Sequence, residues 1–120
     1  MVKKKILIVE DEEPMARALV LKLNKEGYEA ISAENGAKAL EVLDKEKFDL
    51  ILLDLMMPKL DGFGVMAEMK KRKIKIPVIV SSNLSQESDF KKAKEMGAKD
   101  FFVKSDTPLV QVIEHIKEAL

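Results

Sequence analysis

The chain has 120 residues, of which 47% are apolar and 35% charged, and it contains no cysteine. This composition predicts one globular domain spanning residues 1–120, large enough to bury a core of its own. The 21 basic residues balance 21 acidic ones, which argues against nucleic acid or an anionic membrane as a partner bound by bulk charge. Disulfides and thiolate metal sites are excluded. No apolar run is long enough to cross a bilayer, so we expect a cytoplasmic protein.

Short apolar runs alternate with longer amphipathic stretches from one end of the chain to the other. The runs are rich in aliphatic and β-branched residues and are bounded by turn residues, which is typical of strands. We predict five strands, at residues 5–9, 29–32, 50–53, 77–81 and 101–103.

A helical pattern follows each predicted strand, and the third of these helices is expected over about residues 62–72. Residues that can cap or start the five helices are Pro14, Asn35, Asp61, Ser85 and Thr107 followed by Pro108. Gly27 and Gly97 are natural stops after the first and fourth helices. The apolar positions at helical spacing are Met15, Ala18, Leu19, Leu23, Ala37, Leu40, Val42, Leu43, Phe63, Met66, Met69, Phe90, Ala93, Met96, Leu109, Val112, Ile113, Ile116 and Leu120.

Five strand–helix units in succession predict an α/β fold with a parallel sheet, because parallel strands need crossover connections. Right-handed crossovers make a doubly wound sheet, with helices on both faces, the expected form. In such a fold, ligands bind beyond the carboxyl ends of the strands. This edge of the sheet is therefore where we look for chemistry.

Polar and charged residues follow four of the predicted strands. Glu10 and Asp11 follow the first strand, Asp54 the third, Ser82 the fourth and Lys104 the fifth. Each alone is explained by helix capping or solvation. Their joint occurrence favours a site, because Asp54 lies too far from the next helix to cap it.

Three carboxylates at one edge would raise one another's pKa values unless cations join them. Two unit charges about 4 Å apart repel by roughly 4 kcal/mol at an effective dielectric constant near 20. Lys104 supplies one positive charge, and Mg²⁺, which prefers carboxylate oxygens, water and phosphate, could supply the rest. Asp11, Asp54, a backbone carbonyl and, through water, Glu10 are the expected ligands. A carboxylate in such a setting is also a nucleophile towards phosphorus.

With these residues assembled, the whole chain resembles the receiver domain of two-component response regulators, specifically the single-domain, chemotaxis-regulator type. The matching segments are ILIVEDE, LILLDLMMPKLDG, IPVIVSSN and GAKDFFVK. The resemblance implies a flavodoxin-like (βα)5 fold with strand order 2-1-3-4-5. It also implies that a histidine kinase, a phosphotransfer protein or a small phosphodonor supplies a phosphoryl group, which the domain then hydrolyses slowly.

The resemblance also implies a role for each site residue. Asp54 would accept the phosphoryl group, which Lys104 and the switch hydroxyl of Ser82 would contact. Glu10, Asp11, Asp54 and the backbone carbonyl of Met56 would hold Mg²⁺. Phe101 would be the aromatic residue whose rotamer follows the switch. Met56 and Leu84 would flank the phosphorylation pocket and limit the access of water, so we expect slow self-dephosphorylation.

Three residues depart from the family pattern. Ser105 follows the lysine where proline is common, and because a cis bond before a non-proline residue costs about 2.5–4 kcal/mol, we expect a trans or a strained bond. Asn83 follows the switch hydroxyl where a small residue is usual. If the register is shifted by one residue, Ser81 becomes the switch, although Ser82 is preferred. Phe101 replaces the frequent tyrosine and so has no hydroxyl to exchange partners.

The family pattern also implies two protein-binding surfaces, whereas the balanced charge leads us to expect no directly bound nucleic acid and no membrane. A downstream target would contact the face of the fourth helix, fifth strand and fifth helix, here Lys91, Lys94, Phe101 and His115, and the kinase would contact the first helix, here Met15, Ala18 and Leu19. His115 is interpreted as a partly exposed surface residue rather than a phosphohistidine. The domain is expected to be a monomer or a phosphorylation-dependent dimer.

Alternative functions differ in which of these residues they require. A phosphorylation-independent interaction module with the same fold would tolerate loss of the acidic pair, Asp54 or Lys104, and all are present. An aspartate-nucleophile phosphohydrolase needs a second aspartate two residues after the first, and that position is Met56. A flavin-binding domain would need amides and hydroxyls where this chain has acids. We therefore expect a signalling switch rather than a turnover enzyme.

Overall fold

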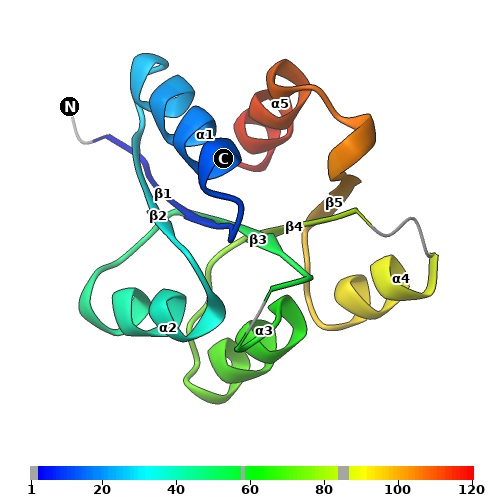
Figure 1. The fold of residues 1–120 in the computed structure, drawn as a ribbon. Helices are drawn as coiled ribbons and strands as arrows, with labels where there is room; N and C mark the ends of the chain where they lie inside the picture. The colour runs from blue at the N-terminus through cyan, green and yellow to red at the C-terminus, as the bar shows by residue number, and fades with distance from the viewer. Residues whose placement is uncertain (1–2, 58, 84–86) are drawn as a thin grey trace.

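The computed structural model describes residues 3–57, 59–83 and 87–120. Its centre is a five-stranded sheet in which every neighbouring pair is parallel, in the order β2-β1-β3-β4-β5 (Figure 1). The strands are β1 (Lys5–Val9), β2 (Glu29–Ala33), β3 (Leu50–Asp54), β4 (Val78–Ser82) and β5 (Asp100–Val103). The predicted fold class and strand order are confirmed.

Helices cover both faces of the sheet (Figure 1). They are α1 (Glu13–Lys25), α2 (Gly36–Lys45), α3 (Gly62–Lys71), α4 (Glu87–Glu95) and α5 (Leu109–Ala119), with a short 3-10 turn, η1 (Lys104–Asp106), after β5. α1 and α5 lie on one face, and α2, α3 and α4 lie on the other. Among the described residues, no helix has both the length and the apolar character needed to span a membrane.

The position of β3 at the centre of the sheet explains why its sequence is apolar at successive positions instead of alternating between apolar and polar residues. Leu50 and Leu52 belong to the core cluster under α1 and α5, whereas Ile51 and Leu53 belong to the cluster under α2, α3 and α4. A strand covered on both faces buries every side chain, and all five residues of β3, Asp54 included, are buried. Asp54 is thus the one charged residue of a fully buried strand.

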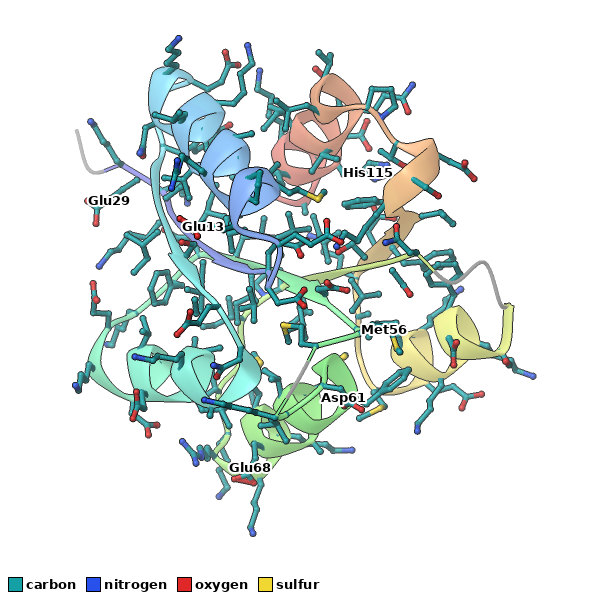
Figure 2. The ribbon with its side chains drawn as sticks, in the orientation of Figure 1. Glu13, Glu29, Met56, Asp61, Glu68 and His115 are labelled. Carbon is teal, nitrogen blue, oxygen red and sulfur yellow. The ribbon has the colours of Figure 1, made fainter. Side chains whose placement is uncertain are left out.

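Two predicted helix caps are confirmed. The Oδ1 atom of Asn35 accepts a hydrogen bond from the backbone N–H of Lys38 at 2.9 Å. Asp61, at the start of α3 (Figure 2), accepts one in the same way from Gly64 at 2.9 Å. Each bond satisfies an N–H group that the first helical turn would otherwise leave unpaired. The predicted cap Ser85 lies outside the described residues.

The predicted start of the last helix is wrong by one residue. The hydroxyl of Thr107 donates to the carbonyl of Val103 at 2.7 Å instead of capping the helix. Pro108 is the residue that precedes α5, and its carbonyl accepts the N–H groups of Gln111 and Val112. The hydroxyl is used to close η1, a turn that the sequence pattern did not predict.

Four of the apolar positions at helical spacing are exposed. They are Ala18, Ala37, Leu109 and Leu120. Ala16 and Ala39, which the predicted pattern did not include, are buried. Helical spacing alone does not show where the buried face of a helix ends, and an alanine carries too little apolar side chain to mark that face in the sequence.

The strand boundaries differ slightly from those predicted. β4 begins at Val78 rather than Pro77, which has no N–H to donate, although its carbonyl still accepts from Ile51 at 3.0 Å. No cis peptide bond occurs among the described residues, so the Lys104–Ser105 bond is trans, as expected.

Candidate functional site

Strand register brings the predicted site residues to one edge of the sheet. β1 pairs with β3 so that Val9 lies opposite Leu53, and β3 pairs with β4 so that Asp54 lies opposite Ser81. The next residues along these two strands, Glu10 and Asp54, therefore lie side by side. Parallel strands end at the same edge, which places Asp54 at the centre of the sheet between the ends of β1 and β4.

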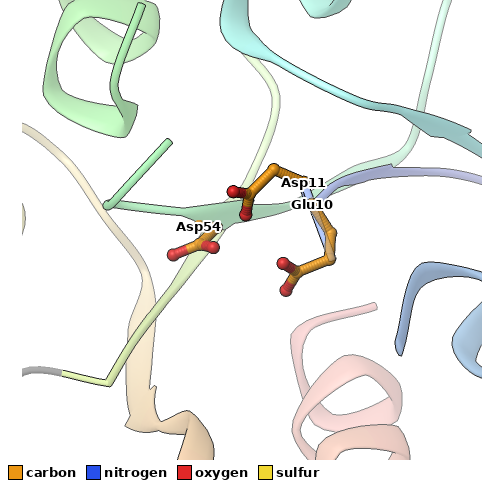
Figure 3. A group of neighbouring side chains, drawn as sticks. All are labelled: Glu10, Asp11 and Asp54. Carbon is orange, nitrogen blue, oxygen red and sulfur yellow. The ribbon is translucent and has the colours of Figure 1, made fainter. Parts of the chain in front are cut away.

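Three carboxylates gather at this edge (Figure 3). Glu10, Asp11 and Asp54 each offer an oxygen atom, and these atoms lie within 4.8 Å of one another. Glu10 and Asp54 are only 4% and 2% exposed, whereas Asp11 is exposed to solvent. The cluster therefore has a buried side and one member that faces the solution.

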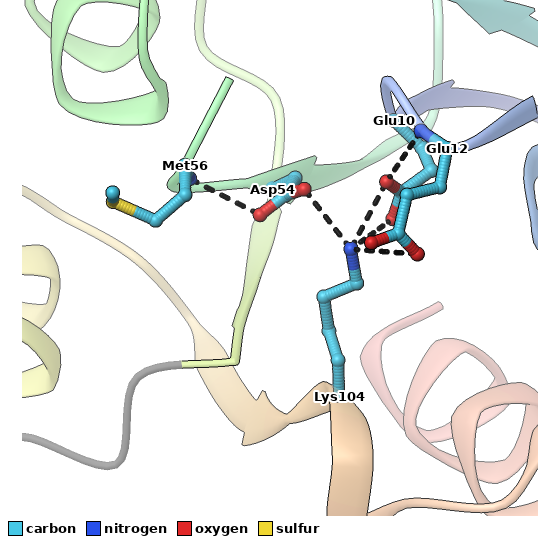
Figure 4. Close-up of polar contacts among 5 residues, drawn as sticks. All are labelled: Glu10, Glu12, Asp54, Met56 and Lys104. Atoms are coloured by element: carbon cyan, nitrogen blue, oxygen red, sulfur yellow. Dashed lines mark hydrogen bonds and ion pairs between the residues drawn. The ribbon is translucent and has the colours of Figure 1, made fainter.

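Lys104 is the cation that faces the two buried acids, Glu10 and Asp54, from η1 (Figure 4). Its Nζ atom lies 3.1 Å from Oδ2 of Asp54 and 2.8 Å from Oε1 of Glu10. The lysine side chain is only 5% exposed, so both contacts are shielded from bulk water. Glu12 adds a third carboxylate, with Oε2 at 3.7 Å from Nζ, a contact that the sequence reasoning missed.

Backbone N–H groups hold the two buried carboxylates in place. Met56 donates to Oδ1 of Asp54 at 3.1 Å, and Glu12 donates to Oε2 of Glu10 at 3.0 Å. Since Oδ2 of Asp54 faces Lys104, each oxygen of this carboxylate has a donor of its own. The Asp54 side chain is thereby held by two donors on opposite oxygens.

Burial decides the protonation equilibria of the site. It raises the pKa of Glu10 to about 7, and the nearby charge of Asp54 adds to the increase, although Lys104 and the N–H of Glu12 oppose it. Burial also raises the pKa of Asp54, against the lowering effect of Lys104. Burial lowers the pKa of Lys104, but its hydrogen bond to Glu10 and the charge of Asp54 outweigh this, so the net change is an increase. The single positive charge of Lys104 therefore does not balance the negative charges of the three carboxylates.

The donor set at this edge suits a hard divalent cation. Three carboxylates lie within reach of one ion, and thiol and imidazole groups are missing among them. Mg²⁺ binds through one or two carboxylates together with water and phosphate oxygens. Asp11, Asp54 and Glu10 fit this requirement, and the exposed Asp11 leaves an open side on which water and a phosphoryl group could bind.

The two serines of β4 differ in position. Ser81 lies opposite Asp54, whereas Ser82, which is fully buried, lies opposite Val103 of β5. Phe101 in β5 is 40% exposed and stacks on Phe90 of α4, with ring centroids 4.6 Å apart. Ser82 and Phe101 thus lie on the adjacent strands β4 and β5 at the side of the sheet that α4 covers.

Comparison with known proteins identifies the family to which this chain belongs. Residues 6–116 match the family model of the response regulator receiver domain. The chain belongs to the response regulator receiver family. Its structure superposes on that of TrrA, a response regulator of Thermotoga maritima solved in complex with Mg²⁺-BeF, with a TM-score of 0.83 and 34% identity over 98% of this chain and 99% of that one. The receiver domain of Francisella response regulator 1452 gives a TM-score of 0.90 at 26% identity, covering 98% and 96% of the two chains.

Curated relatives of this receiver domain are transcriptional regulators. The regulator PhoP of Bacillus subtilis, named for alkaline phosphatase synthesis, is 39% identical over 88% of this chain and 44% of its own length. A probable transcriptional regulator, ycf27, of Porphyridium aerugineum is 44% identical over 90% of this chain and 45% of its own length. The chain thus spans less than half of these relatives, so the expected absence of a nucleic-acid partner gains no support from them.

All but one of the residues predicted for the two binding surfaces are at least partly exposed. On the α4–β5–α5 side, Lys91, Lys94 and Phe101 are exposed, and His115 is partly exposed (Figure 2), where it stacks on Phe102 and contacts Asp100. On α1, Ala18 is exposed and Met15 is half-buried.

Leu19 is the wrong prediction among them. It is 1% exposed and packs in the core between α1 and the sheet, so it cannot contact a kinase at the surface.

Proposed function

We propose that this receiver domain, spanning residues 1–120, accepts a phosphoryl group on Asp54 in a Mg²⁺-dependent reaction and then changes its binding to a partner. The observation that carries the proposal is the buried Asp54 carboxylate, which is held between the Nζ atom of Lys104 and the N–H of Met56 beside two further acids. The TrrA structure with Mg²⁺-BeF supports a Mg²⁺ site in a protein of this fold.

The proposed reaction is an in-line transfer onto one oxygen of Asp54. A new bond forms between that oxygen and phosphorus while the bond from phosphorus to the donor breaks, and the leaving group departs with the electron pair. Mg²⁺, held by Asp11, Asp54, Glu10 and the Met56 carbonyl, would neutralise charge on the phosphoryl oxygens. Lys104 is already next to Asp54 and would stabilise the same developing charge.

The proposed switch lies in β4 and β5. Ser82 would donate its hydroxyl hydrogen to the new phosphoryl group and move towards it. Phe101 would change rotamer in response, and since it stacks on Phe90, this movement would reach α4. The α4–β5–α5 face, with Lys91, Lys94 and His115, would then present a different surface to a downstream protein.

The proposed donor is a histidine kinase, a phosphotransfer protein or a small phosphodonor, and α1 would receive a protein donor through Met15 and Ala18. The domain would be a monomer or would dimerise on phosphorylation. Self-dephosphorylation would be slow, because Met56, two residues after Asp54, would limit the access of water to the phosphoryl group. Met56 is 56% exposed, and Leu84, the second residue expected to limit water, lies outside the described residues. Loss of the phosphoryl group within seconds would contradict this.

The decisive experiment measures phosphorylation directly. Incubation with acetyl phosphate and Mg²⁺ is expected to add one phosphoryl group to the intact protein, as seen by mass spectrometry, and EDTA should prevent the gain. Hydroxylamine should remove the group, because an aspartyl phosphate is an acyl phosphate. A folded protein that gains no mass would contradict the proposal and favour the phosphorylation-independent interaction module.

Replacing Ser82 by alanine tests which serine contacts the phosphoryl group. We expect Ser82→Ala to slow phosphorylation by acetyl phosphate about tenfold or more, because one hydrogen-bond donor to the developing charge is lost. The matched change Ser81→Ala, one residue earlier in the same strand, should have a much smaller effect. Rates come from the mass increase with time, and a larger effect of Ser81→Ala would move the switch to that residue.

A further inference from the structure

A hollow lies at the opposite end of the sheet from Asp54. It occupies about 330 Å³ between the carboxyl ends of α3 and α4 and the start of β4, the strand that leads from Val78 to Ser82 at the site. Its apolar lining consists of Met66, Met69, Ile74, Ile76, Val78 and Met96. Small-molecule sites commonly have volumes of about 300–1,000 Å³, so the hollow can hold a short apolar chain or a single ring.

Part of this lining is left incompletely covered by the fold. Met66, Met69 and Val78 are buried, whereas Ile74, Ile76 and Met96 are only partly buried against the same core cluster. Three of the six lining side chains are methionines, which are flexible and adapt to ligands of different shape. The hollow therefore offers an apolar surface that a small ligand could remove from water.

Three lysines surround the opening. Lys70, Lys73 and Lys75 line the hollow and are exposed, and no ion pair is formed by any of them within the described residues. Arg72, in the same segment, does pair, with Asp44 at 2.8 Å and Glu68 at 3.4 Å. In a chain with no net charge, these three unpaired cations concentrate positive charge around an apolar opening.

Lys73 has an unusual backbone conformation for a lysine. It is the second residue after the end of α3, and its φ of 59° is left-handed. Glycine or asparagine usually occupies such a position at the end of a helix, because a side chain there is strained. The lysine thus holds a cation at the rim at a position where a glycine would fit more easily.

We propose that this hollow, the α3–α4 pocket, binds a small amphiphile with a short acyl chain and a monoanionic head. The apolar chain would lie against Met69, Ile74 and Met96, and the head would pair with the lysines of the rim. The charge pattern selects an anion over a cation, and the volume selects one small molecule. This proposal is independent of phosphorylation at Asp54.

Methyl NMR of the methionines can test the binding directly. Octanoate, added below its micelle concentration, is expected to shift the methyl signals of Met66, Met69 and Met96 in a saturable manner. The signal of Met56, which lies at the other end of the sheet, should not move. Octyltrimethylammonium should bind roughly tenfold or more weakly, and acetate should cause no saturable shift.

Two sets of variants separate binding from stability. Lys73→Gly removes a rim cation and relieves the left-handed lysine, so octanoate affinity should fall roughly three- to tenfold while Tm stays unchanged or rises. Lys70→Gln combined with Lys75→Gln should weaken binding further. The control, Lys45→Gln with Lys47→Gln, removes two exposed lysines outside the pocket and should leave the affinity unchanged.

Several results would overturn the proposal. These are equal binding of the cationic amphiphile, shifts spread over all methionines, or an unchanged affinity in both rim-lysine variants. Co-sedimentation with anionic vesicles without binding of monomeric octanoate would indicate a membrane surface instead and would likewise overturn it.

Discussion

Replacing Asp54 by asparagine is expected to abolish the Mg²⁺-dependent gain of a phosphoryl group from acetyl phosphate. Asparagine has nearly the same shape and can still accept the N–H of Met56, which donates at 3.1 Å in the structure. Its amide is not a nucleophile towards phosphorus and carries no charge to bind Mg²⁺. The loss should therefore be complete in the intact mass, although the fold is retained.

The same variant should be more stable than the wild type when no divalent cation is present. Burial raises the pKa of Asp54, which means that the ionised carboxylate is less stable in the folded than in the unfolded protein. A neutral amide avoids that cost and also removes the charge beside Glu10. Urea unfolding in EDTA should show a higher free energy of unfolding for Asp54→Asn than for the wild type.

Mg²⁺ should reverse this order. An ion that binds only the folded wild type stabilises it by about 2.7 kcal/mol when its concentration is about one hundred times its Kd. Asp54→Asn should gain much less, because one ligand is lost. Asp106→Asn, which replaces an exposed acid of η1, is the control and should behave like the wild type in every assay. Phosphorylation of Asp54→Asn at the wild-type level would show that another residue is the acceptor.

The fold and most of the site could be predicted because they depend mainly on the order of strands and helices and on the parallel direction of the strands. The fully apolar stretch before Asp54 predicts a strand covered on both faces, and a series of such strands with helices between them permits few topologies. Once the strands are parallel, their ends share one edge, so Glu10, Asp54 and Lys104 had to lie near one another. Their 2.8 Å and 3.1 Å contacts follow from topology more than from local sequence.

Other features could not be predicted, because they depend on choices between near-equal alternatives. Thr107 could cap α5 or bond to Val103, and both bonds use the same hydroxyl. The reach of Glu12 to Lys104 depends on the rotamer of a flexible side chain next to a turn. Helical spacing placed Leu19 on an apolar face but could not show that the face is covered by the sheet.

The pocket between α3 and α4 shows a second limit. Its lining comes from α3, the loop after α3, the start of β4 and the turn after α4, and no local pattern marks such a combination. The basic segment at residues 70–75 is visible in the sequence, where it suits the negative end of a helix dipole. Only the structure shows that three of its lysines surround an apolar opening.

Replacing Lys104 by methionine is expected to have the largest effect on stability of any change in the site. Methionine matches the length of the lysine stem but leaves Glu10 and Asp54 buried without their cation. Removal of one partner of a buried ion pair typically costs about 3–5 kcal/mol. We expect a loss of about 3 kcal/mol in the free energy of unfolding, at the lower end of that range, because the site opens to water on the side of Asp11.

Addition of Mg²⁺ distinguishes the two roles that Lys104 could have. As a neutralising charge, the lysine could be partly replaced by a divalent ion, so Mg²⁺ should restore more stability to Lys104→Met than it adds to the wild type. As a contact of the phosphoryl group, it could not be replaced in this way, and phosphorylation should stay slower by roughly a hundredfold or more even in saturating Mg²⁺. Lys91→Met, at an exposed position of α4, is the matched control. Unchanged stability in EDTA would mean that water already screens Glu10 and Asp54, and the buried ion pairs would then have little energetic weight.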